Sequence, residues 1–296
     1  MRLIERPGVL HLFDGRRVVS FRGDDAGRRA IRRAVDGAGA ALDAGPDVDG
    51  VRDAQELLIR LGLAQPDARP DGDVSDAAAF ASAAVAGWVS AREAEQRLAG
   101  TDVQVWEGPG DELRRALSDS GARCAALPGP ARIAGLDPAR SLVVVAAADE
   151  EPMQRLHEVN AACLAHGVSW LPVGGYDGAI VHVGPLMIPG QSACAECLSR
   201  RLAANVEYAE AYPDICTAPS APAPPALRDW AYSIAALIVL RWIANRDARL
   251  PGRLFTLVPD ELTIREATVY RVPRCTSCAG PDLVNAVAPW DIARDH

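Results

Sequence analysis

The sequence contains no lysine, so all 31 of its basic residues are arginine. Lysine and arginine both keep a protein surface soluble, so we attribute the absence of lysine to genome composition. Its chemical consequence holds whatever the cause, because a phosphate-loop lysine, a Schiff base and a lysine general base all need the missing amine. These three kinds of site are therefore excluded.

Long apolar segments are also missing. The longest largely apolar run, residues 231–240, is far shorter than the roughly 18 residues of a membrane-spanning helix. The opening residues, MRLIERPG, lack the apolar core of a secretory signal. The formal net charge of -8 disfavours nucleic acid or an anionic membrane as the main partner. The sequence thus indicates a cytoplasmic protein with neither kind of partner.

The first 66 of the 296 residues have the pattern of a small separate module. Apolar residues alternate on both sides of Asp14-Gly15, a dipeptide typical of β-hairpin turns. Amphipathic helices are expected at 28–35 and 51–61. A hairpin followed by short helices is typical of a winged-helix-like α+β module, so we place the first domain at 1–66.

The composition changes after the Asp-, Pro- and Gly-rich stretch 66–73. The alanine-rich segment 76–98 predicts one helix, so residues 67–100 form a linker and a helix. From residue 101 to 296, apolar runs alternate with helical patterns, which predicts an α/β domain with a parallel sheet covered on both faces. Strands are expected at 103–107, 123–127, 142–147, 168–173, 179–183, 254–258 and 266–272, with helices at 111–120, 151–166 and 229–243. Five prolines make 212–227 an irregular loop.

Two CxxC pairs carry the most specific chemical signal: Cys194 with Cys197, and Cys275 with Cys278. A CxxC turn brings two thiolates to one ion at about 2.3 Å, and two such turns complete a tetrahedron suited to zinc. A redox CxxC usually opens a helix after a strand, a setting that these patterns do not indicate. Four thiolates leave no open position, so the predicted zinc is structural. The alternative is two unrelated redox or accidental pairs.

The other three cysteines form no comparable pattern. Cys124 and Cys163 lie in an expected strand and on an apolar helix face, which predicts buried small hydrophobes. Cys216, in the proline-rich loop, is the one thiol that could be exposed and reactive. An incidental loop cysteine is the simpler interpretation.

Signals for nucleotide binding are incomplete. Gly108 and Gly110 lie where a dinucleotide fold turns from its first strand into its first helix. Asp111 and Glu112 directly follow these glycines and would repel a phosphate. No acidic residue occurs within 121–136, where a dinucleotide fold is expected to have its ribose-binding carboxylate. The acidic residues 149–151 could hold magnesium, but their position before a helix favours a helix-start role. We expect a vestigial nucleotide fold.

The segment 148–198 resembles the ubiquitin-activating, ThiF-like superfamily. It combines an acidic turn after a strand, an Asn and a Cys on the next helix, the strand GVSWLPV and the motif GPLMIPGQSACAEC. The second CxxC pair and the proline-rich segment, which fits that family's crossover loop, continue the resemblance. It implies a ThiF-like Rossmann-type domain with structural zinc over 101–296, and a homodimer. Of the family's nucleotide-binding positions only Asp149 matches, so ATP use is not expected.

A small N-terminal module before such a domain is similar to the bacteriocin cyclodehydratase partner proteins of azole-peptide pathways. That resemblance implies a RiPP recognition element that binds the leader of a ribosomal precursor peptide. It also implies a YcaO cyclodehydratase partner, which uses ATP to cyclise Cys, Ser or Thr, while this chain has no catalytic residue. The alternatives are an adenylating enzyme that activates a carboxylate and a stand-alone peptide-binding scaffold.

An open hairpin edge can accept an extended peptide as an additional strand, while a neighbouring helix supplies pockets for side chains. Hairpin strand 17–22 and helix 51–61 are the candidates. The expected peptide-binding residues are Val18, Val19, Ser20, Phe21, Leu57, Arg60 and Leu61. The apolar ones that point inward would serve ordinary core packing instead.

Overall fold

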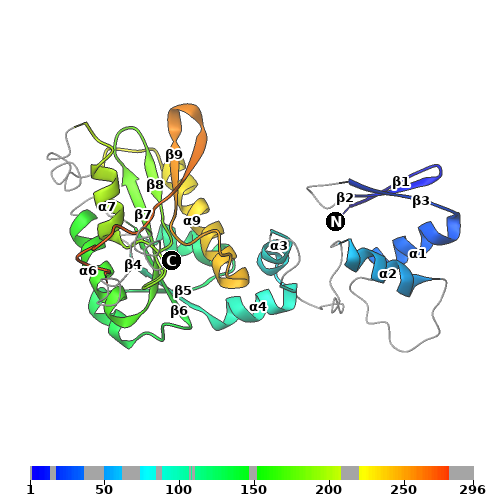
Figure 1. Cartoon of the computed structure of the whole chain (residues 1–296), viewed down its shortest axis with the longest axis horizontal. Coiled ribbons are helices and arrows are strands. Elements are labelled where there is room, and N and C mark those ends of the chain that lie inside the picture. Colours follow the sequence, from blue (N-terminus) through cyan, green and yellow to red (C-terminus); the bar gives the residue numbers. More distant parts are fainter. Residues whose placement is uncertain are drawn as a thin grey trace, which may run out of the picture. The chain divides into compact units, whose positions relative to one another are not determined.

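The computed structural model divides into two compact units, Met1–Gln96 and Arg97–His296. Both units are drawn in Figure 1. The structure describes residues 2–13, 18–36, 50–61, 74–84, 89–106, 108, 111–146, 152–207 and 220–279.

The first unit contains a three-stranded antiparallel sheet of β1 (Arg2–Arg6), β2 (Val9–Phe13) and β3 (Val18–Arg22) in the order β1-β2-β3. Phe13 pairs with Val18 across the hairpin, which confirms the expected β2 and β3. The predicted turn at Asp14-Gly15 lies outside the described residues. Strand β1 was not expected, because its sequence, RLIER, lacks the apolar alternation of a half-buried strand.

Helices α1 (Asp25–Asp36) and α2 (Val51–Arg60) confirm the two helices expected from amphipathic spacing. Both lie on the same side of the sheet (Figure 1). Their apolar residues bury the inward side chains of β2 in one core, formed by Leu10, Leu12, Ala30, Ile31, Ala34, Ala54 and Leu58. These helices thus cover one face of the sheet and leave its other face without their cover.

The prediction of a single helix over 76–98 was wrong. The structure has α3 (Asp76–Ala84) and α4 (Ala91–Gly100), with Ser90 in a non-helical conformation just before α4. The Ser90 hydroxyl accepts a hydrogen bond from the Glu93 backbone N–H at 3.1 Å. A serine followed three residues later by glutamate is a helix-start signal, and here it outweighs the alanine-rich composition.

The second unit is built on a seven-stranded mixed sheet. Its strands are β4 (Asp102–Trp106), β5 (Arg123–Ala126), β6 (Ser141–Ala146), β7 (Ser169–Tyr176), β8 (Val181–Val183), β9 (Arg253–Val258) and β10 (Thr263–Thr268). Their order is β10-β9-β8-β7-β6-β4-β5, and only β5, β4, β6 and β7 run parallel. The expectation of a parallel sheet thus holds for four strands. The links from β7 to β8 and from β9 to β10 are too short for a parallel crossover.

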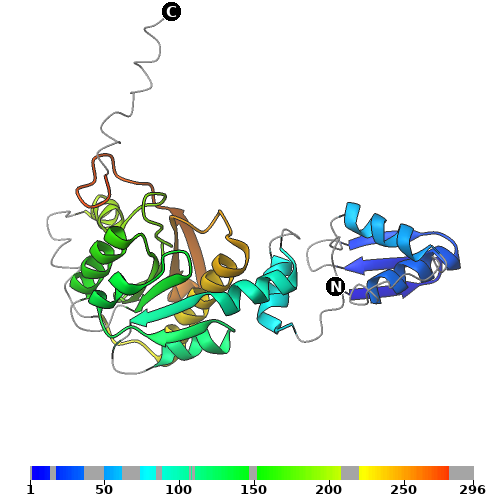
Figure 2. The same cartoon turned by 90° about the horizontal axis from the view of Figure 1, so that it is seen from below.

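Helices cover both faces of this sheet, as expected (Figure 2). They are α5 (Glu112–Asp119), α6 (Pro152–His166), α7 (Ala195–Ala203) and α9 (Pro225–Asn245), with short 3-10 turns η1 (Pro130–Gly135) and η3 (Pro259–Glu261). The core under α6 joins Val143, Val145 and Trp170 of the sheet to Val159 and Cys163. Among the described residues, no helix combines the length and apolar character that a membrane crossing requires.

The proline-rich loop ends earlier than expected. Helix α9 begins at Pro225, within the predicted loop 212–227, because proline at the first helical position sacrifices no backbone hydrogen bond. Residues 220–224 are irregular, whereas 208–219, including Cys216, lie outside the described residues.

Candidate metal centre and open strand edge

Four cysteine thiols from two distant parts of the chain meet in the second unit. The Sγ–Sγ distances are 3.8 Å for Cys194–Cys197, 3.7 Å for Cys194–Cys275 and 3.5 Å for Cys197–Cys278. A tetrahedron with metal–sulfur bonds of about 2.3 Å has edges of about 3.8 Å. All four sulfur atoms lie within 4.8 Å of one another, and three of the cysteines are buried. The cluster can therefore hold one metal ion with all four ligands supplied by protein.

The first CxxC pair does open a helix, contrary to the expectation from sequence. Cys194 is the N-cap of α7, and Cys197 lies in its first turn. Backbone N–H groups and the positive end of the helix dipole favour thiolates there, as they do in redox sites. The second pair at the same place makes the difference, because the two pairs together provide four sulfur donors, whereas a redox pair provides two.

Two arginines that sequence reasoning missed hold the CxxC segments together. Arg200 donates hydrogen bonds to the Glu196 carboxylate at 2.6 Å and to the Thr276 hydroxyl at 3.2 Å. Glu196 belongs to the first CxxC segment and Thr276 to the second. Arg271 likewise donates to the carbonyls of Gly190 at 3.0 Å and Cys278 at 2.6 Å. The two CxxC segments are thus joined by these hydrogen bonds as well as by the contacts between their thiols.

Further hydrogen bonds orient the first pair. The side-chain oxygen of buried Asn160 on α6 accepts from the Ala195 backbone N–H at 3.0 Å, which fixes the start of α7. The Val272 N–H donates to Cys197 Sγ at 3.3 Å. Such outer contacts orient metal ligands and stabilise their charge.

Without metal, burial opposes charge on most of these thiols. It raises the pKa of Cys194 and that of Cys278. Burial acts the same way on Cys275, but backbone hydrogen bonds from Cys278 and Ser277 and thiol contacts bring the pKa of Cys275 below its ordinary value. A metal ion must displace the protons that remain, so its binding strengthens as the pH rises.

Of the two cysteines predicted to be buried outside the cluster, one is fully buried and the other is not. Cys163 is fully buried on α6, and burial raises the pKa of its thiol to about 12, which confirms a small hydrophobe. Cys124 in β5 is only half-buried, because β5 is the edge strand of the sheet.

A side-chain pair lies at the carboxyl ends of two of the parallel strands. The chain leaves β5 on one side of β4 and enters β6 on the other, and at such a switch point α/β folds bind ligands. Here the Arg155 guanidinium lies 4.7 Å from the centroid of the Trp106 ring, at the end of β4. Arg155 also donates to the Ala146 carbonyl at 3.4 Å, at the end of β6. Arg155 thus contacts the ends of both paired strands.

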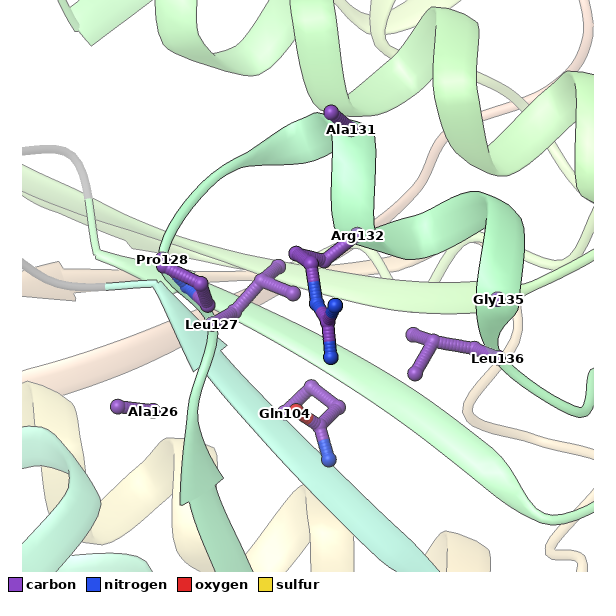
Figure 3. Close-up of a pocket in the computed structure, with 8 residues that line it drawn as sticks. All are labelled: Gln104, Ala126, Leu127, Pro128, Ala131, Arg132, Gly135 and Leu136. Carbon is purple, nitrogen blue, oxygen red and sulfur yellow. The ribbon is translucent and has the colours of Figure 1, made fainter.

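A cavity of about 590 Å³ lies between η1 and the edge of the sheet (Figure 3). The Arg132 side chain of η1 extends toward Gln104 of β4. Its lining consists of Gln104, Ala126, Leu127, Pro128, Ala131, Arg132, Gly135 and Leu136, none of which is acidic. The described part of the cavity lining therefore offers no carboxylate to bind a ribose. Gly108 is described, whereas Gly110 and the acidic residues 149–151 lie outside the described residues.

The expected peptide-binding residues lie on β3 and on or just after α2. Among the described strands β3 pairs only with β2, so its outer edge is free. Along β3, Val18 and Ser20 are exposed, while Val19 and Phe21 are half-buried. Phe21 packs against the core shared with α2, so part of its role is structural. Leu57 and Leu61 are half-buried and Arg60 is exposed.

Comparison with known proteins identifies the fold but no family. Neither a scan against protein-family models nor a search of curated proteins finds a match. A heterocyclase solved with substrate and cofactor is 18% identical with a TM-score of 0.67. The match covers 95% of this chain and 39% of the heterocyclase chain. The heterocyclase TruD is 19% identical with a TM-score of 0.63, and the match covers 94% of this chain and 42% of TruD. This chain thus spans about two fifths of those heterocyclases.

A third solved structure matches over nearly its full length. MccB of E. coli, solved with AMPCPP and selenomethionine MccA, is 13% identical with a TM-score of 0.59. The match covers 94% of this chain and 97% of MccB. Identities this low establish a shared fold alone. Over nearly its whole length, the chain has the fold found in these two heterocyclases and in MccB.

Proposed function

We propose that this protein is a non-catalytic partner that binds the leader of a ribosomal precursor peptide and delivers the peptide to a YcaO cyclodehydratase. The outer edge of β3 carries the proposal, because among the described strands only β2 pairs with β3, and an open strand edge offers its backbone groups to an extended peptide. The fold shared with heterocyclases, and with an MccB that was solved with MccA, supports a peptide substrate. The product would be an azoline or azole ring in that peptide.

The proposed division of labour has three parts. Residues 1–66 act as the recognition element, 67–100 connect, and 101–296 form a ThiF-like Rossmann-type domain. One structural zinc on Cys194, Cys197, Cys275 and Cys278 stabilises that domain, since four thiolates close the coordination sphere. We propose a homodimer in solution.

Leader binding is tested with proline on β3. Successive N–H groups of an antiparallel strand alternate between its two neighbours, so one of Val19→Pro and Ser20→Pro removes a donor from the free edge alone. That variant should keep its melting temperature and metal content but bind the leader at least about tenfold more weakly. The measurement is fluorescence anisotropy with the synthetic leader of a precursor encoded beside this gene. The wild type should bind with a micromolar or lower dissociation constant.

The contrary result is equally clear. If both proline variants bind the leader as the wild type does, the β3 edge is not the recognition surface.

The likeness to MccB, solved with AMPCPP, favours adenylation as a second candidate function. Against it stand the absence of lysine and a cavity whose described lining contains no carboxylate. We therefore expect no measurable ATP binding by calorimetry at millimolar ATP with magnesium. A micromolar dissociation constant would refute the non-catalytic proposal, and pyrophosphate exchange would then test carboxylate activation.

A further inference from the structure

One face of the three-stranded sheet turns away from the helices. Glu5 pairs with Arg32 of α1 at 2.7 Å, so Glu5 faces the helices and its neighbours Ile4 and Arg6 face the opposite way. Directly paired residues of neighbouring strands point to the same face of the sheet, so the register assigns the residues of β2 and β3 to the two faces as well. The outward residues are Ile4, Arg6, Val9, His11, Phe13, Val18, Ser20 and Arg22, and we call this set the open face.

The strand register arranges the open face in rows that differ in chemistry. One row is basic at both ends and runs from Arg6 through Val9 to Arg22. The middle row runs from Ile4 through His11 to Ser20, with a His11–Ser20 hydrogen bond of 2.8 Å. The third row has Arg2 at its β1 position and is apolar at its β2 and β3 positions, where Phe13 pairs with Val18. The face thus changes from cationic to apolar along the length of β3.

Two properties of the open face are unusual for a solvated sheet. The outward face of an antiparallel sheet is normally polar, yet Ile4 is 50% and Val18 61% exposed. None of the eight residues is acidic, although the chain as a whole is. Arg6 and Arg22 form no ion pair with any described residue. Both features are consistent with a ligand that carries acidic and apolar side chains.

We infer that the leader carries an acidic residue opposite Arg22, a polar residue opposite Ser20 and an apolar residue opposite Val18. The inference rests on the proposed addition of the leader to β3 as a fourth strand. Directly opposed side chains then share a face, so the outward residues of the leader extend the three rows. The acidic and apolar residues stand four positions apart, whichever way the strand runs. The residues between them, opposite Val19 and Phe21, face the helices and are apolar.

The structure offers a matched pair of arginines for the test. Arg22 would lie directly opposite the acidic residue of the bound strand, at about 5 Å. Arg6 belongs to the same row and face, but three strand spacings separate it from that position, about 14 Å, which exceeds the screening length at physiological salt. A local contact therefore predicts an effect at Arg22 and little at Arg6.

The experiment selects peptides from a randomised display library with the full chain as bait. Enriched peptides should show the acidic and apolar residues four positions apart. Arg22→Glu should weaken the binding of such a peptide roughly fivefold to tenfold, and Arg6→Glu less than about twofold. Changing the acidic peptide residue to lysine should restore binding to the Arg22→Glu variant. Fluorescence anisotropy at physiological salt measures each pair.

Each contrary result has a distinct meaning. Equal weakening by Arg6→Glu and Arg22→Glu would show a diffuse attraction and overturn the inference. So would selected peptides without the spacing, or no effect of Arg22→Glu on peptides that the β3 proline variants no longer bind. In that last case the proposed function stands. If the selected peptides bind the wild type and both proline variants equally well, strand addition itself fails.

Discussion

A Cys275→Ser variant is expected to lose its metal ion and more than about 4 kcal/mol of folding stability. Closed four-thiolate sites contribute their binding free energy directly to folding, and three remaining ligands hold zinc far more weakly. Cys275 is a buried residue of the second CxxC segment, so its loss also releases the 3.7 Å contact with Cys194 in the first segment. Elemental analysis should find about one zinc per wild-type chain. Thermal unfolding should show the loss of stability.

Cys124→Ser is the matched control for that experiment. Cys124 is a half-buried thiol on the edge strand β5 and is not one of the four clustered cysteines. This variant should retain its zinc and unfold close to the wild-type temperature. A wild-type chain that is fully folded and free of metal would falsify the proposed site.

The second large effect is expected at Asp247, just after α9. Its side chain is 2% exposed and accepts hydrogen bonds from Arg249 Nε at 2.9 Å and from a second Arg249 nitrogen at 3.0 Å. Arg241 of α9 donates to the same carboxylate. Burial alone would raise the pKa of Asp247, but the hydrogen bonds from Arg249 and Arg241 outweigh it and lower this pKa to about 2.

Asp247→Asn should therefore destabilise the protein by about 2 kcal/mol at neutral pH. The folded pKa lies below the ordinary value of 3.8, so the ionised carboxylate stabilises the folded state above that value. This contribution is lost as the pH falls from 3.8 through about 2. Chemical unfolding at neutral and acidic pH measures the difference between the two proteins, which should shrink toward zero at the lowest pH.

Asp229→Asn, at an exposed position on α9, is the control and should change stability by less than about 0.5 kcal/mol. A difference between wild type and Asp247→Asn that stays constant from neutral to acidic pH would show that the carboxylate charge is not the cause.

Local sequence patterns predicted most of the helices and strands, because any other secondary structure was unfavourable for those segments. The run 142–147 is apolar throughout, and the structure buries its residues 142–146 in β6, an interior strand of the sheet. The spacing of Leu57 and its neighbours likewise predicted α2. Predictions failed where a single local contact decided the outcome. The Ser90 cap divides the alanine-rich segment, and Pro225 starts a helix inside a loop prediction.

The sequence alone determined the chemistry of the metal centre, because CxxC spacing brings two thiols together within one turn. That the two pairs meet was decided by the tertiary structure, since 81 residues separate Cys194 from Cys275. Strands β9 and β10 return beside β8 and bring the second pair to the start of α7. The open face has the same origin. Arg6 and Arg22 are 16 positions apart in sequence, and only the pairing of three strands places them in one row.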